Sequence, residues 1–422
     1  MATVSETLGH RAQLFHDLLM EVATGPNGIF VSFPRFDTRR SFQHEETHAY
    51  VQQLIDDHWG PINRKPTAAE WLYGENTLWL EGWFLWSQML RYEATGESEA
   101  LVSARKCFWD MTYLFELSGE IEPGALGKPH GGRPSNHTVH DQSACPVMFY
   151  ARFALTLATD EERRTAFEYL RAHGDFYLNR GWVMNSDGRA HNVVDPPRTS
   201  SMKSMAAVYQ AYEATGDTRY RDAVGGQLQL LVESGRLPWL KNPFAVSHNL
   251  YYWGLLCDYW TTTELANQFD WSRCIEEYGR AIPACLDDEG LVVFGDYDIE
   301  AGVHTPYFER WLSREDNDGD WIGPAPNRVD RLWLGSKNAS GRAFTSATLA
   351  AGLLLSRKHV ITENAHELAA KTLLRLDEDT VRWWWDDGGL PSELKGLRNI
   401  CAPEVAAMWL VAYWMGRLQG AW

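Results

Sequence analysis

Residues 127–143, GKPHGGRPSNHTVHDQS, hold the densest set of side chains able to transfer protons or bind anions. The glycines and prolines indicate a loop, and the apolar run that follows indicates a helix. One interpretation makes Asp141 the N-cap of that helix, with solvated neighbours. We favour a functional interpretation, in which Asp141 belongs to a site together with His137, His140 and the cations of the loop.

A second motif, at residues 44–48, matches the H-E-x-x-H pattern of zinc proteases. On a helix this spacing places two histidines on one face, beside a glutamate that can activate a metal-bound water. The third ligand that such enzymes carry at a fixed spacing is missing. We therefore expect one turn of a packing helix, and we predict no metal and no cofactor.

The acidic segment 314–321, REDNDGDW, resembles the first half of a calcium loop because Asp316, Asp318 and Asp320 alternate. The glutamate expected at the twelfth position is replaced by Asn327. A solvated acidic turn is the favoured interpretation, and calcium binding is left open.

The composition limits the class of protein and its partners. Hydrophobic residues make up 45% of the 422 residues, which is enough for a large core. The net charge of −17 argues against nucleic acid as a partner. Without a signal peptide or a long apolar run, we expect a soluble cytoplasmic protein and no membrane partner. The six cysteines stand singly, so reduced core thiols are expected.

A repeat indicates the architecture that positions these residues. The string YEATG occurs at 92–96 and again at 212–216, and LTLATDEER at 155–163 is interpreted as its counterpart between them. The spacing of roughly 60 residues suits a helical hairpin plus a loop. Each unit has an apolar, aromatic-rich helix, a short turn and a charged amphipathic helix.

This repeating pattern predicts inner helices at about 75–95, 141–158, 200–215, 247–262, 341–356 and 402–418. Outer partners follow at about 98–118, 160–178, 217–233, 269–285 and 363–377, and the helices before residue 60 supply the sixth. The predicted fold is therefore an all-α (α/α)6 barrel, a single domain over residues 1–422. Strand-like runs are few, such as GLVVF at 290–294.

In such a ring the loops from each outer helix to the next inner helix gather at one end. Here these are the long loops, at 119–140, 179–199, 234–246, 286–340 and 378–401. Loops over a barrel mouth commonly carry function, so the candidate site is expected there and at the starts of the inner helices.

An aromatic-rich ring whose second inner helix opens with His140-Asp141 and continues CPVMFYARFAL resembles the six-hairpin glycosidases. The unsaturated glucuronyl hydrolases and related uronic-acid glycosidases are the most similar in this respect, and residues 200–220 are similar to their third inner hairpin. The resemblance implies that Asp141 is the general acid and base on an oligosaccharide with a terminal uronic acid. Where that family has a second aspartate, at the head of the third inner helix, this chain has 199–201, Thr-Ser-Ser, and Lys203. A glycosidase for saturated uronic acids and a lyase are equally compatible with that difference.

A glycosidase normally uses two carboxyl groups across the scissile bond. Glu75 is the first choice as partner of Asp141, because Gly74 and Asn76 place it at a loop-to-helix junction. Asp195 and Glu404 are alternatives. Glu81, farther down the same helix, is expected to reach either the cavity or a polar network in the core.

A lyase needs a base and groups that neutralise the uronate carboxylate. His137, His140, His248 or Tyr251 would be the base, and this alternative stays open. The predicted substrate-binding residues are Asn76, Arg133, Arg198, Lys203, His248, Tyr251, Trp333 and Arg342, chosen for bidentate carboxylate binding, amide contacts or stacking on sugar rings.

We therefore expect a glycoside hydrolase for a uronic-acid-containing oligosaccharide, with an oligosaccharide lyase as the second hypothesis. A hydratase or isomerase of a small hydrophobic molecule on the same ring is the third. The sugar, the linkage and the oligomeric state are left open, and a homo-oligomer is one of the alternatives.

Overall fold

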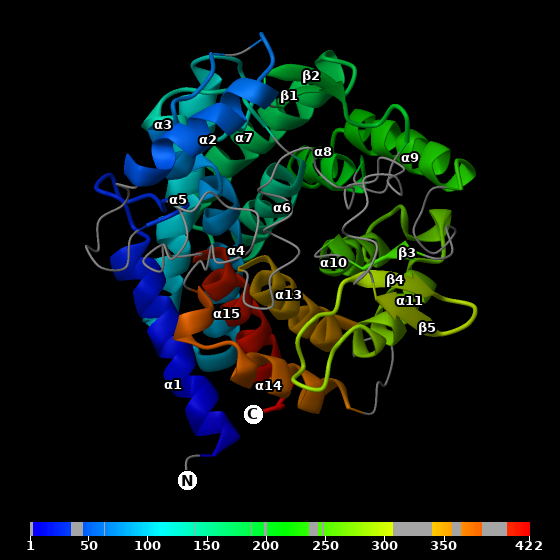
Figure 1. Ribbon diagram of the computed structural model, residues 1–422. Helices are drawn as coiled ribbons and strands as arrows, with labels where there is room; N and C mark the ends of the chain where they lie inside the picture. Colours follow the sequence, from blue (N-terminus) through cyan, green and yellow to red (C-terminus); the bar gives the residue numbers. More distant parts are fainter. Residues whose placement is uncertain are drawn as a thin grey trace. The chain divides into compact units, whose positions relative to one another are not determined.

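The computed structural model describes residues 3–34, 45–62, 64–138, 140–186, 188–197, 201–235, 244–246, 249–306, 340–356, 364–381 and 403–422 (Figure 1). His44, the first histidine of the H-E-x-x-H motif, and the acidic segment 314–321 lie outside these residues. Within the described ranges, no helix is long and apolar enough to cross a membrane.

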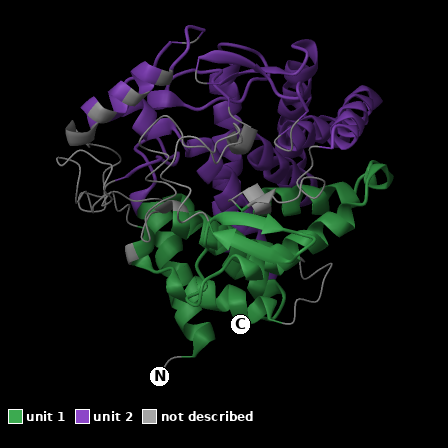
Figure 2. Ribbon diagram, turned by 45° about the vertical axis from the view of Figure 1, so that its right-hand side comes forward, with its two compact units in different colours: residues 1–21, 35–39, 238–422 green, residues 22–34, 40–237 purple. Residues whose placement is uncertain are grey.

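The chain divides into two compact units (Figure 2). Unit 1 comprises residues 1–21, 35–39 and 238–422, and unit 2 comprises residues 22–34 and 40–237. The single-domain expectation stays a prediction.

Unit 2 contains three helical hairpins built as the sequence predicts. The helices are α2 (Glu45–His58), α3 (Ala68–Gly74), α4 (Thr77–Thr95), α5 (Ser98–Gly119), α6 (His140–Thr156), α7 (Asp160–Asn179), α8 (Ser201–Thr215) and α9 (Thr218–Glu233). Helices α4, α6 and α8 are the inner helices, and α6 packs against both of the others. They are apolar on most sides, which suits helices that are buried all round.

Unit 1 contains the remaining predicted helices in its described part. They are α1 (Val4–Asp17), followed by the short π-helix η1 (Leu18–Val22), and then α10 (Asn249–Thr261), α11 (Trp271–Ala284), α13 (Ser340–Ser356), α14 (Ala365–Arg375) and α15 (Pro403–Leu418). Helix α13 packs against α10, α14 and α15. The N-terminal helix α1 packs against α15, and Arg11 donates hydrogen bonds to the carbonyls of Leu373, Leu374 and Leu376 at the end of α14. Helix α1 therefore lies beside α14 and α15, and the completion of an outer ring by the helices before residue 60 stays a prediction.

The YEATG repeat is a turn that ends one helix and begins the next. Gly96 and Gly216 have φ values of 70° and 72°, a left-handed conformation that glycine adopts without strain. The threonine before each glycine donates to a carbonyl four residues back and accepts the amide two residues on. The counterpart at 155–163 works differently, because Thr159 is the N-cap of α7 in a capping box with Glu162.

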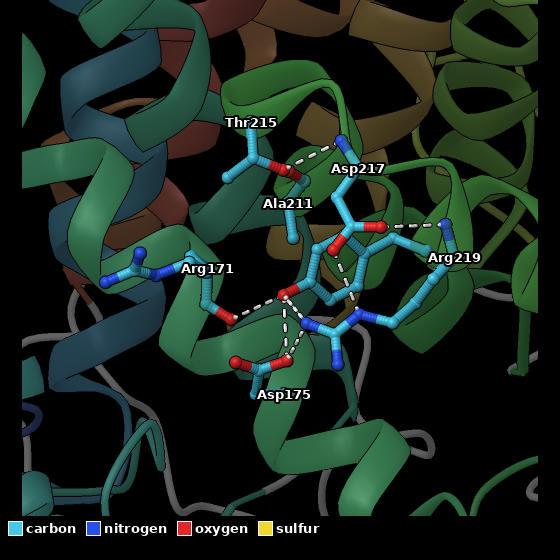
Figure 3. Close-up of polar contacts among 7 residues, drawn as sticks. Arg171, Asp175, Ala211, Thr215, Asp217 and Arg219 are labelled. Atoms are coloured by element: carbon cyan, nitrogen blue, oxygen red, sulfur yellow. Dashed lines mark hydrogen bonds and ion pairs between the residues drawn. The ribbon is translucent and has the colours of Figure 1, made fainter.

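Figure 3 shows how the second YEATG turn is tied to the preceding hairpin. Arg219 donates to Asp175 of α7 at 2.6 Å, and the Tyr220 hydroxyl donates to the same carboxylate at 2.8 Å. Asp217 accepts the Arg219 amide at 3.0 Å and so begins α9. Side chains next to the turn therefore fix the position of α9 against α7.

The described strands are short and lie in the loops between outer and inner helices. Strands β1 (Val183–Ser186) and β2 (Arg189–Asn192) form an antiparallel hairpin, and β3 (Phe244–Ala245), β4 (Gly295–Asp298) and β5 (Val303–Pro306) form an antiparallel sheet in the order β3-β4-β5. The strand-like run 290–294 forms only an isolated bridge, between Val292 and Leu286, because the chain turns at Asp287 before it extends. Cys107, Cys257, Cys274 and Cys285 are buried free thiols, and Cys145 is buried as well.

Candidate functional site

The clearest contact at the candidate site joins the α3–α4 junction to the predicted loop. Glu75 lies between α3 and α4, and its Oε1 forms an ion pair with the ammonium group of Lys128. The Lys128 side chain is only 3% exposed and that of Glu75 is 15% exposed. Residues 53 positions apart in sequence are therefore joined by a shielded ion pair.

The backbone permits this contact because loop and helix approach each other closely. A Cβ atom on Gly74 would lie 2.5 Å from the carbonyl oxygen of Pro129, so any other residue would push the loop away. The Lys128 amide donates to the His137 carbonyl at 2.8 Å, and Thr138 donates to the Leu126 carbonyl at 2.8 Å. These bonds fold residues 124–138 back on themselves just before α6 begins.

Two histidines of this loop form a pair beneath its surface. His130 Nε2 and His137 Nδ1 are 2.9 Å apart, and both side chains are buried. The ring of Trp59 meets His137 edge-on, with ring centroids 4.7 Å apart. Of these two nitrogens, one must donate and the other accept, so the two rings fix each other's tautomers.

Residues 29–34, here called the strap, hold the other side of the α3–α4 junction. The Ser32 amide donates to the Tyr73 carbonyl at 3.1 Å, and the Asn76 amide donates to the Ser32 hydroxyl at 2.6 Å. At Phe30 the carbonyl accepts the Thr77 hydroxyl at 2.8 Å. Glu75 and Asn76 are thus positioned by backbone bonds to the strap as well as by Lys128.

The strap is anchored on a buried polar network between α4 and α5. Glu81 is fully buried and accepts the Phe30 amide at 2.8 Å. Lys106 pairs with Asp110 at 2.5 Å, and its ammonium lies 4.4 Å from the centroid of the Phe30 ring. Burial raises the pKa of Glu81 to about 8, although Lys106 acts in the opposite direction. Of the two roles predicted for Glu81, the structure shows the core polar network.

The same network contains the one set of potential metal ligands found among the described residues. Donor atoms of Glu81, Cys107 and Asp110 all lie within 4.8 Å of one another. Lys106 already supplies a cation to this set, and a protonated Glu81 leaves the cluster neutral. The arrangement therefore fits a network of carboxyl groups around a lysine better than a metal site.

A second ionic network supports the far end of the loop. Asn136 donates to Glu122 at 3.0 Å, and Arg180 pairs with the same carboxylate at 2.5 Å. His173 donates from Nδ1 to the Gly124 carbonyl at 2.8 Å, where the loop begins. These contacts hold the segment on α7.

The buried state of His173 leads to a stability prediction. Burial lowers the pKa of His173 to about 4, although the bond with Gly124 acts in the opposite direction. Between about pH 4 and 6.5 the unfolded chain binds a proton that the folded chain does not, so unfolding free energy is lost as the pH falls. Its contribution to that loss is expected to be about 2–3 kcal/mol.

Denaturant unfolding of wild type, His173→Phe and the exposed-site control His10→Phe at several pH values measures this contribution. The variant at 173 should lose part of the decline in stability between pH 6.5 and 4, and the control should keep it. An unchanged decline in His173→Phe would contradict the assignment.

The structure places the other predicted site residues as follows. His140 and Asp141 begin α6, but their side chains are outside the description. Arg133 is exposed and pairs with Glu70 of α3 at 3.3 Å. Lys203 is buried in α8. Arg198, His248 and Trp333 lie outside the described residues.

Two predicted substrate-binding residues belong to unit 1. Tyr251 is buried in α10, and Arg342 of α13 pairs with Asp287 while donating to the Val292 carbonyl at 2.8 Å. The guanidinium of Arg342 thus holds the turn before β4. Their roles in substrate binding stay predictions.

The structure adds Lys128, His130 and Trp59 to the candidate site. Lys128 and His130 belong to the same loop as His137, so the sequence contained a signal for them in the density of polar residues. Nothing in the sequence pairs Lys128 with Glu75, because the contact depends on how the loop folds.

Comparisons with known proteins bear on the fold. No family model matches the chain, and no curated protein matches it. Among solved structures, it is similar to a crystal structure from Salmonella enterica subsp. enterica serovar Paratyphi A that is described as a possible member of the GH105 family. The TM-score is 0.50 at 12% identity, and the match covers 100% of this chain and 96% of that chain. That structure has an (α/α)6 barrel, so the predicted all-α (α/α)6 fold class is confirmed.

Proposed function

We propose that the chain is a glycoside hydrolase that cleaves a uronic-acid-containing oligosaccharide, with Asp141 as general acid and base and Glu75 as the second carboxyl group. The observation that supports this most is the contact between Glu75 and Lys128. It brings one candidate carboxylate against the loop that leads directly into the first turn of α6, where Asp141 stands. The similar solved structure, described as a possible GH105 member, is consistent with a glycoside hydrolase.

Glu75 and Asp141 suit the two different roles that carboxyl groups have in hydrolysis. A carboxylate beside a lysine is stabilised in its ionised form, which suits a base or nucleophile. The acid that protonates the leaving oxygen would then be Asp141. His137 lies three residues before α6 and would orient this region through its bond with His130. Arg198, Lys203, His248 and Trp333 remain candidates for the sugar and its carboxylate.

Asp141→Asn is expected to reduce turnover at least about a hundredfold, because amide cannot replace carboxyl as a proton donor. The substrates are 4-nitrophenyl β-D-glucuronide and a panel of saturated and unsaturated uronic-acid disaccharides. Hydrolysis is measured as new reducing ends, and a lyase reaction as the ultraviolet absorbance of a new double bond.

The matched control is Asp160→Asn, the same change in the first turn of α7 at an exposed side chain. The control should keep wild-type turnover. Substantial activity in Asp141→Asn would remove Asp141 from the mechanism, and a new double bond in the product would replace hydrolysis by elimination.

A further inference from the structure

Lys128 is a lysine in a candidate carbohydrate site, and the obvious role for it would be to bind the substrate carboxylate. Its surroundings argue otherwise. The side chain is 3% exposed, and its ammonium group is already in contact with Glu75. Because its ammonium group already has a carboxylate of the protein as partner, we expect Lys128 to act on Glu75 and not on a substrate.

The position of Lys128 is itself fixed on both sides by the loop backbone. Its amide donates to the His137 carbonyl at 2.8 Å, and its carbonyl accepts the His130 amide at 2.9 Å. The ammonium therefore approaches Glu75 from a rigid turn, whose close packing on Gly74 leaves no room for a side chain. These bonds hold the ammonium group of Lys128 beside the Glu75 carboxylate.

We propose that Lys128 is the positioning residue for Glu75: it fixes the orientation of the carboxylate and keeps it ionised. The inference rests on the proposed function, because Glu75 is given a catalytic role there. The loop carrying Lys128 leads into α6, so the same contact couples the placement of Glu75 to the segment that ends at Asp141. Lys128 would thus set the relation between the two carboxyl groups without touching substrate.

Several described polar side chains near the junction have partners other than Glu75. Tyr73 and Glu70 belong to α3, and His130 and His137 belong to the loop. Glu70 is paired with Arg64 at 3.1 Å and with Arg133 at 3.3 Å. Tyr73 donates to Asn27 at 3.0 Å, and the two histidines contact each other. Among these, the ion pair that reaches Glu75 comes from Lys128.

The test compares Lys128→Met, Lys128→Arg and the control Lys65→Met, whose lysine forms an exposed ion pair with Asp56. In Lys128→Met, kcat should fall about ten- to a hundredfold with a smaller change in KM. The acid limb of the pH–rate profile should move about 1–3 units to higher pH, because the carboxylate has lost its cation. In Lys128→Arg the acid limb should return part of the way to its wild-type pH. Lys65→Met should leave kcat and the pH of the acid limb unchanged.

A double-variant cycle separates this role from general support of the fold. If Lys128 acts through Glu75, Lys128→Met should reduce kcat little further in a Glu75→Gln background. Fully additive effects, or an unmoved acid limb, would overturn the proposal.

A substrate-free measurement distinguishes failure of this inference from failure of the proposed function. Carbon NMR of labelled glutamate carboxyl groups follows the titration of Glu75, identified by its loss in Glu75→Gln. A titration that moves to higher pH in Lys128→Met supports the positioning role even if Asp141→Asn retains activity. A titration that does not move overturns the role even if Asp141→Asn is inactive.

Discussion

Replacing Lys106 with methionine is expected to lower the free energy of unfolding by about 3–5 kcal/mol, because it leaves buried carboxyl groups without their cation. Lys106 pairs with Asp110 at 2.5 Å, and the side chains are only 23% and 18% exposed. Glu81, fully buried beside them, also loses the nearest positive charge. Methionine keeps most of the volume of the lysine stem, so the loss is mainly electrostatic.

Urea unfolding of Lys106→Met and of Lys65→Met provides the comparison. Lys65 makes an ion pair at 3.0 Å with side chains 41% and 50% exposed, so its loss should cost less than about 1 kcal/mol. Adding Asp110→Leu to Lys106→Met should recover part of the stability, because removing both partners leaves less unpaired charge. Equal effects at positions 106 and 65 would show that the network contributes no more than a surface pair.

The second large effect is a pH dependence that Glu81→Gln should remove. Burial raises the pKa of Glu81 from 4.5 to about 8, with Lys106 opposing and Asp110 adding to the shift. Between these two values the folded chain holds a proton that the unfolded chain has released. The contribution of Glu81 is therefore fully present below about pH 4.5 and is lost as the pH rises through about 8.

The size of this effect is at most about 5 kcal/mol between pH 4.5 and 8. Relative to Glu81→Gln, which stays neutral at every pH, wild type should lose stability as the pH rises over that range. Glutamine also keeps an oxygen to accept the Phe30 amide. The exposed variant Glu161→Gln controls for the change in net charge, and a wild-type slope retained in Glu81→Gln would contradict a protonated Glu81.

The two buried groups Glu81 and His173 act in opposite directions over the same pH range. As the pH rises, His173 adds stability between about pH 4 and 6.5, and Glu81 removes stability between about pH 4.5 and 8. Their sum predicts maximal stability in mildly acidic solution. Neither effect is visible in the sequence, because both depend on complete burial of a group that is ordinarily exposed.

The helices were predictable because their signals are local. The alternation of apolar and polar residues with a period of 3.6 marks each helix, and short motifs mark its ends. Thr95-Gly96 and Thr215-Gly216 end their helices by contacts within a few residues, so the same string gives the same turn wherever it occurs. Thr159 differs because Asp160 follows it instead of a glycine. It is the N-cap of α7, whereas Thr95 and Thr215 end their helices.

For the candidate site, the sequence indicated which residues to consider, but not their contacts. The sequence indicated the loop 127–143 and the junction at Glu75, since polar residues gather before inner helices. It did not indicate that Lys128 would meet Glu75, that His130 would meet His137, or that Arg342 would hold a turn with Asp287. The two ion pairs join residues 53 and 55 positions apart, and no periodicity carries that information.

By itself, then, the sequence determined the succession of helical hairpins, and through it the all-α (α/α)6 class. Each hairpin is specified by residues close in the chain, where hydrogen bonds and apolar stripes repeat at short range. Only the tertiary structure decided which polar residues are buried, which are paired, and which carboxylate each lysine contacts. Those outcomes depend on the packing of distant segments, such as the strap on α4 and the loop on Gly74, where a single close approach fixes charge and geometry together.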